Sequence, residues 1–232
     1  MKIKTFGWTI LILLILSNIW AKLTEMYWVE NTTYILLFIA AILLVQDKYK
    51  KFNRPMYLFL IFTILSYLAR SFEGVGYSYE ISLVLLSIVN IILIRAAVKH
   101  IEIKNASHLM MLFFLVIVGL NAALLGYHVW GIKDHIHDTA VLSIYILYYF
   151  NLLILGIVAF IYYLNSYSRK SVYFISLALG IIFADILRDM GVFFPEDISV
   201  DIAESIIRLG CAIFAVWFFV TKEKQLRLLN MI

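Results

Sequence analysis

Apolar residues fill eight long stretches of this 232-residue chain, and short polar segments separate them. A helix needs about 20 residues to cross the roughly 30 Å hydrocarbon core of a bilayer. We therefore predict an all-α membrane protein with eight transmembrane helices that forms a single domain over residues 1–232. The predicted spans are 6–22, 31–46, 56–72, 80–98, 108–127, 139–164, 172–190 and 200–221.

The composition supports a membrane protein and excludes several soluble classes. Hydrophobic residues make up 64% of the chain, and the mean hydropathy is +0.95, whereas soluble domains are roughly 45 to 50% apolar. Eight crossings leave no room for a soluble catalytic domain. The single cysteine, Cys211, excludes an intramolecular disulfide and a cysteine-based zinc site. The motifs G-x-S-x-G and H-E-x-x-H, typical of soluble hydrolases, do not occur.

Basic residues concentrate in every second gap between the apolar stretches. With a cytoplasmic N-terminus, thirteen of them lie inside: Lys2, Lys4, Lys48, Lys50, Lys51, Arg54, Lys99, Lys104, Arg169, Lys170, Lys222, Lys224 and Arg227. The outer group is Lys22, Arg70, Lys133 and Arg188. This bias follows the positive-inside rule and predicts that both termini are cytoplasmic.

The same topology explains the formal charge of +4 without a nucleic-acid surface, because cytoplasmic loops meet an anionic leaflet. We expect a multi-pass protein of the cell membrane, in bacteria the inner membrane, with membrane lipid as its partner. Neither a nucleic-acid partner nor a soluble protein partner follows from the sequence. The sequence does not indicate an oligomeric state.

Charged residues occur inside two of the predicted spans, where they are costly and usually face the bundle interior. The seventh span carries Asp185, Arg188 and Asp189, and the eighth carries Asp201, Glu204 and Arg208. Each set lies on one helical face, so two acids and two arginines are expected to meet, with Arg208 pairing to Glu204 one turn away. These charges either form ion pairs that hold the two helices together or line a polar pocket. Such a pocket would bind a lipid headgroup or form a hydrolytic site.

Histidine and tyrosine supply weaker candidates. The outer segment after the fifth span contains His128, Asp134, His135, His137 and Asp138, which are either solvated loop residues or ligands of a metal ion. Because nothing fixes a third ligand, we predict no metal site and no cofactor.

The sixth span carries three tyrosines that share a face, Tyr145, Tyr148 and Tyr149. They either pack in the core or line a cavity with their hydroxyl groups. Arg95, near the inner end of the fourth span, is interpreted as a snorkelling anchor.

The topology and the stretch Gly180-Ile-Ile-Phe183-Ala184-Asp185 resemble the YhhN-type lysoplasmalogenase family, which has a comparable G-x-x-F, Ser-Asp arrangement in its seventh helix. The third helix of the family bears S-x-x-G-D, whereas this chain has Ser66-Tyr-Leu-Ala69-Arg70. The fourth helix of the family bears an aromatic residue, a glycine and a histidine. At the same spacing this chain has Tyr79, which keeps the aromatic residue, and Ser82 and Asn90 in place of the other two.

The resemblance implies cleavage of the vinyl ether of a lysoplasmalogen, which needs an acid to protonate the enol ether and a base to activate water. The resemblance places one catalytic aspartate on Asp185. Because Arg70 stands where the family has its other aspartate, we expect Glu204 to be the second member of the catalytic pair. The implied substrate-binding residues are Arg70, Arg188, Arg208, Tyr145 and Asn90. The alternative is a non-catalytic lipid-binding, sensory or assembly factor in which the same charges are structural.

Overall fold

The computed structural model describes residues 2–45, 52–72, 76–101, 108–166, 168–193 and 198–223, with backbone only for 2–6, 108–111, 113 and 114. These residues form eight α-helices and a short 3-10 helix, and no strand occurs among them. The helices are α1 (Lys2–Leu23), α2 (Tyr27–Leu44), α3 (Arg54–Ser71), α4 (Ser78–Val98), α5 (His108–Ile132), α6 (Thr139–Ser166), α7 (Arg169–Phe193) and α8 (Ile198–Val220), and the 3-10 helix η2 is Lys133–His135.

Each predicted span overlaps one of these helices, and the described residues are all-helical, so the all-α class is confirmed. Among the described residues, six helical segments are long and apolar enough to cross a membrane: α2, α4, α6, α7, α8 and the stretch Leu115–His135, which covers most of α5. The apolar part of α1 is shorter, Gly7–Leu23, and α3 carries an arginine near each end. The number of eight crossings therefore stays a prediction.

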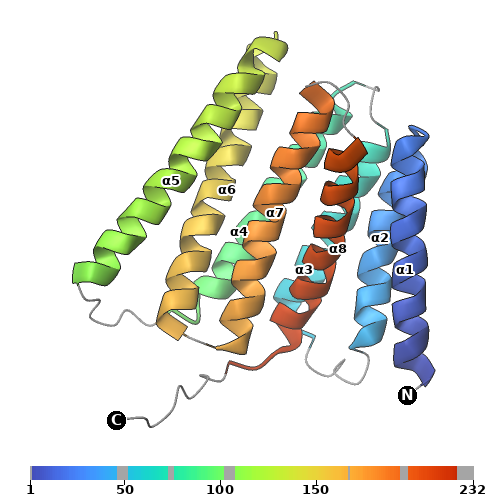
Figure 1. Ribbon diagram of the computed structural model, residues 1–232, viewed down its shortest axis with the longest axis horizontal. Coiled ribbons are helices and arrows are strands. Elements are labelled where there is room, and N and C mark those ends of the chain that lie inside the picture. The colour runs from blue at the N-terminus through green and yellow to red at the C-terminus, as the bar shows by residue number, and fades with distance from the viewer. Residues whose placement is uncertain are drawn as a thin grey trace.

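Seven of the helices form a closed ring. In order of contact they are α1, α2, α3, α4, α6, α7 and α8, and α8 closes the ring against α1 and α2. Helix α5 stands outside this ring and packs chiefly on α6 (Figure 1). Helix α1 begins, and helix α8 ends, at the same end of the bundle (Figure 1).

The pair α7 and α8 makes the most extensive helix contact in the bundle. A Cβ atom at Gly180 of α7 would lie 2.6 Å from the Sγ atom of Cys211 of α8, so the glycine permits this close approach. Further along, the rings of Phe174 and Phe218 lie 4.9 Å apart. This tight contact brings the charged faces of α7 and α8 together.

Two helices begin at side-chain caps. The side chain of Asn53 accepts a hydrogen bond from the backbone N–H of Met56 at 3.1 Å, and Pro55 occupies the first turn of α3, where no N–H is needed. The Oγ atom of Ser168 accepts from the N–H of Ser171 at 3.0 Å at the start of α7. These contacts satisfy N–H groups that have no partner within the helix.

The structure corrects one boundary of the sequence analysis. His128 lies in α5 and not in an outer loop, because Val129, Trp130 and Ile132 extend the apolar helix to its end at Ile132. Several residues of the proposed inner group lie outside the described residues: Lys48, Lys50, Lys51, Lys104, Lys224 and Arg227. For Lys2 and Lys4 only the backbone is described.

Candidate functional site

A row of five buried charged side chains connects α8 to α7, and we refer to it as the ion-pair chain. Its members are Glu204, Arg208, Asp185, Arg188 and Asp189, whose exposed fractions range from 0 to 8%. Arg208 donates through Nε to Glu204 and through Nη2 to Asp185 at 2.9 Å. Arg188 donates to Asp185 at 2.9 Å, and its Nη2 atom lies 3.0 Å from Asp189.

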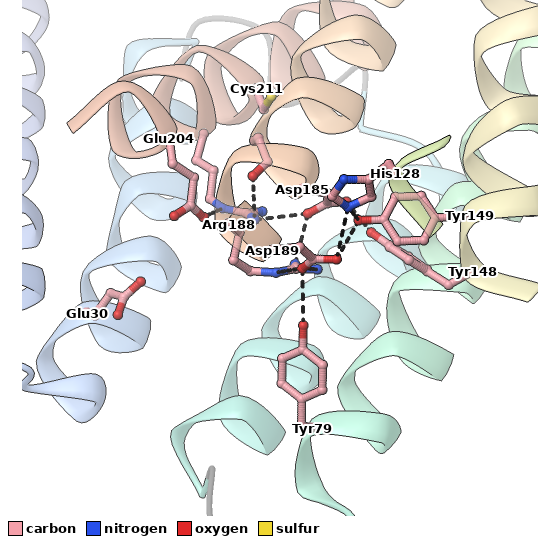
Figure 2. A network of polar contacts seen from close by, with 12 residues as sticks. Glu30, Tyr79, His128, Tyr148, Tyr149, Asp185, Arg188, Asp189, Glu204 and Cys211 are labelled. Atoms are coloured by element: carbon pink, nitrogen blue, oxygen red, sulfur yellow. Dashed lines mark hydrogen bonds and ion pairs between the residues drawn. The ribbon is translucent and has the colours of Figure 1, made fainter. Parts of the chain in front are cut away.

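The charges in the ion-pair chain alternate in sign, so each arginine lies between two carboxylates (Figure 2). Moving an isolated charge out of water costs several kcal/mol, and a well-placed opposite charge offsets this cost. The predicted pairing of Arg208 with Glu204 is confirmed. The predicted meeting of two acids and two arginines from α7 and α8 is also confirmed.

Three further helices bind the ion-pair chain through polar side chains. Tyr148 of α6 donates its hydroxyl hydrogen to Asp185, and Tyr149 donates to Asp189. Tyr79 of α4 approaches Asp189 at 3.5 Å (Figure 2). His128 of α5 lies 2.9 Å from the Tyr149 hydroxyl and 3.6 Å from Asp189.

Lys22, at the end of α1, extends the ion-pair chain on the side of α8. Its ammonium group contacts Glu204 directly and lies 3.6 Å from Asp201 and 3.8 Å from Glu30 of α2.

These ion pairs limit the chemistry of the two candidate catalytic carboxylates. Glu204 and Asp185 each contact two cations, so either acid would have to leave them before it could protonate a substrate.

A polar cavity of about 450 Å³, here the outer cavity, lies at the end of the bundle where α1 ends and α8 begins. Its charged lining residues are Lys22, Glu25, Glu30, Arg70, Arg188, Asp201 and Glu204. Glu25, in the turn between α1 and α2, has a φ of 54°. Few side chains other than glycine adopt this conformation.

Arg70 of α3 differs from the other cations of the outer cavity. Its side chain is only 6% exposed, and its Nη2 atom has no hydrogen-bond acceptor among the described residues. The guanidinium lies over the ring of Tyr79, 5.2 Å from the ring centre. Lys22 and Arg188, in contrast, are each paired with carboxylates. Among the described residues that line the outer cavity, Arg70 is therefore the cation with no carboxylate partner found.

A second cavity, here the central cavity, has a volume of about 40 Å³ and lies among α2, α3, α4, α6, α7 and α8. Asp185 and Arg208 line it, together with Thr63, Asn90 and Cys211. Glu204 and Arg188 line the outer cavity instead. The ion-pair chain thus lies between the two cavities.

The predicted site residues are divided between these two cavities. Arg70, Arg188 and Glu204 line the outer cavity, whereas Asp185, Arg208 and Asn90 line the central cavity. Tyr145 lines neither of them. Its ring stacks on that of Tyr79 with centres 5.9 Å apart.

Sequence reasoning missed Lys22 and His128 as members of the network. Lys22 was assigned to the outer polar group, because its position at the end of a span gives no sign of a buried partner 182 residues away. His128 was grouped with His135 and His137 as a weak metal candidate. No group of three or more His, Cys, Asp or Glu side chains that could hold a metal ion occurs within the described part of the chain.

A separate polar cluster lies at the opposite end of the bundle. Glu223, which follows α8, accepts hydrogen bonds from Tyr162 and Ser166. Burial raises the pKa of Glu223, but these hydrogen bonds outweigh it and leave the pKa below its usual value. His100 lies 2.9 Å from the ammonium of Lys170. Burial, reinforced by that cation, lowers the pKa of His100.

Comparison of the chain with protein-family models, with curated proteins and with solved structures finds no match. The resemblance to YhhN-type lysoplasmalogenases therefore rests on the sequence motifs alone. The geometry of the two cavities has to carry the functional argument.

Proposed function

We propose that the chain is a multi-pass cell-membrane protein with eight transmembrane helices and both termini in the cytoplasm. Six apolar helical segments support this topology. Arg54, Lys99 and Arg169 lie at the end of the bundle where α1 begins, whereas Lys22 and Arg70 lie at the other end (Figure 1). In this orientation the outer cavity opens toward the non-cytoplasmic side, in bacteria the periplasmic side.

We further propose that the outer cavity binds the phosphate-bearing headgroup of a membrane lipid or lysolipid. The observation that carries this proposal is Arg70, a buried guanidinium that lines the cavity and whose Nη2 atom has no hydrogen-bond acceptor among the described residues. Guanidinium groups bind phosphate through two parallel charge-assisted hydrogen bonds. A volume of about 450 Å³ falls within the range of small-molecule sites, roughly 300 to 1,000 Å³.

Equilibrium binding to the protein in detergent micelles tests this proposal. A lysophospholipid is compared with a monoacylglycerol that has the same acyl chain but no phosphate, and inorganic phosphate is the third probe. We expect the lysophospholipid to bind more tightly than the neutral lipid. Tight binding of inorganic phosphate alone would identify a soluble phosphate compound as the ligand instead.

Arg70→Gln is the decisive variant, because it keeps most of the side-chain bulk and removes the charge. Hydrogen bonds to charged groups contribute about 1.5 to 3 kcal/mol, so lysophospholipid affinity should fall by about tenfold or more. Lys133→Gln, which removes an outer cation away from the cavity, is the matched control. Equal affinities for wild type and Arg70→Gln would contradict the proposal.

Hydrolysis of a lysolipid vinyl ether is the second candidate. It is favoured by one observation: Asp185 and Asn90, two positions that the family resemblance singles out, line the same central cavity. The assay is release of fatty aldehyde from a lysoplasmalogen by the purified protein. Because the acids are held in ion pairs, we expect no release. If the wild-type protein forms aldehyde and Asp185→Asn abolishes this activity, the protein is a hydrolase, and lipid binding is the first step of its reaction.

A further inference from the structure

We propose that the central cavity is a hydration site, in which bound water completes the hydrogen bonding of Thr63 and Asn90 next to the ion-pair chain. The ligand class is water alone, and the site is distinct from the outer cavity. The argument rests on unpaired polar atoms, on cavity size and on the residues that line the walls. It does not depend on the proposed lipid ligand.

Two buried polar groups that face the central cavity lack protein partners. The side chain of Thr63 on α3 is 4% exposed and that of Asn90 on α4 is 2% exposed. The Thr63 Oγ1 atom and the Asn90 Nδ2 atom have no hydrogen-bond partner among the described residues. A polar group that is buried without a partner is strongly unfavourable, and ordered water is the usual partner in such places.

The size of the central cavity selects water over larger ligands. A single water needs about 10 to 15 Å³ of cavity volume, so a cavity of about 40 Å³ holds about three or four waters. It is too small for a headgroup or an acyl chain. Asp185 and Arg208 add charged walls, so a water placed there finds the two to four polar partners that it requires.

The position of this water matters for the ion-pair chain. The outer cavity hydrates Glu204 and Arg188, and the central cavity hydrates Asp185 and Arg208 from the other side. The buried charges then keep part of their hydration, which lowers the cost of removing them from bulk water. Arg208 and Arg188 both bind Asp185 between the two cavities.

Hydroxyl-radical labelling by X-ray radiolysis tests the proposal on the intact protein, because radicals formed from bound water oxidise adjacent buried side chains. Cys211 lines the central cavity, whereas Met56, a second readily oxidised sulfur residue, is buried away from it. Because a thiol is intrinsically more reactive than a thioether, each rate is divided by the rate of the same residue in the unfolded protein, and we expect this ratio to be several-fold higher for Cys211 than for Met56. Equal, low ratios at both residues would mean a dry cavity and overturn the proposal.

Thr63→Val supplies the matching variant, because it keeps the side-chain shape and removes the hydroxyl. We expect it to slow the oxidation of Cys211 and to lower the thermal midpoint. Thr33→Val is the control, because the Thr33 hydroxyl has its partners elsewhere, in Asn18 and the Glu30 carbonyl. A Thr63→Val protein with a raised thermal midpoint and unchanged Cys211 oxidation would overturn the proposal. Lysophospholipid binding is measured separately, so either proposal can fail alone.

Discussion

Arg208 contacts carboxylates on two helices, which makes it the most informative single residue for stability. Its guanidinium binds Glu204 within α8 and Asp185 on α7. Loss of one member of a buried charge pair typically costs about 3 to 5 kcal/mol, because the partner is left without its counter-ion. We expect Arg208→Ala to lower the thermal midpoint of the protein in detergent markedly.

Arg95 provides the comparison for this substitution. It lies near the end of α4 with an exposed side chain, as a snorkelling residue does. Arg95→Ala should therefore leave the thermal midpoint nearly unchanged. Equal, small losses in both variants would show that water, and not the carboxylates, satisfies Arg208.

Tyr148 tests the connection between α6 and the ion-pair chain. Its hydroxyl donates to Asp185, so Tyr148→Phe removes one donor and leaves the ring in place. A hydrogen bond to a charged group contributes about 1.5 to 3 kcal/mol, and the unfolding free energy should fall by about that amount. Tyr57→Phe, at an exposed ring, is the control. A loss no larger than that of Tyr57→Phe would contradict the assigned hydrogen bond.

His100 makes stability depend on pH. Its pKa is lowered from the usual 6.5 by burial and by Lys170, so the folded protein favours the neutral ring. As the pH falls below about 6.5, the unfolded chain takes up this proton first, and stability decreases. The lowered pKa of Glu223 adds a loss in the same direction only at more acidic pH.

The measurement is the thermal midpoint in detergent between about pH 7.5 and pH 5. Wild type should lose stability across this interval. His100→Gln, which keeps a neutral hydrogen-bond acceptor, should lose less. Parallel curves for the two proteins would show that His100 does not cause the pH dependence.

At the scale of helices, the close contact of α7 with α8 depends on a glycine, Gly180, which has no side chain. Gly180→Ala would place a Cβ atom 2.6 Å from Cys211 Sγ, and overpacking of this kind costs about 1 to 3 kcal/mol. Cys211→Ala should relieve the clash, so the double variant is expected to be more stable than the sum of the single effects predicts. Gly119→Ala, where no atom lies within 4 Å, should cost nothing.

The sequence was informative about faces within a helix and uninformative about partners between helices. The spacing of Glu204 and Arg208 predicted their pairing, because residues four apart on a helix are neighbours. The pairing of Lys22 with Glu204 had no such signal, since it depends on how α1 packs against α8. The two cavities likewise arise from side chains of several helices, and no local pattern records them.

At the scale of the whole molecule, the topology is the property to test first. Reporter fusions on the side that we propose to be cytoplasmic should give cytoplasmic signals after Lys51, Lys104, Lys170 and Arg227. Fusions on the other side should give the opposite signal after Glu30, Glu73, Lys133 and Glu196. The reason is the excess of basic residues on one side. Two or more reversed sites would refute the predicted orientation.

The contact between Lys22 and Glu204 also bears on how the protein is made. The two residues lie 182 positions apart, on the first and the last helix, and a ribosome produces α1 long before α8. Glu30 of α2, 3.8 Å from Lys22 in the finished bundle, is synthesised before the other two carboxylates near this ammonium, those of Asp201 and Glu204. The ring of helices closes only when synthesis of α8 is complete. A nascent chain that stops before Ile198 lacks Asp201 and Glu204, so Glu30 is the one of these three carboxylates that is left to pair with Lys22.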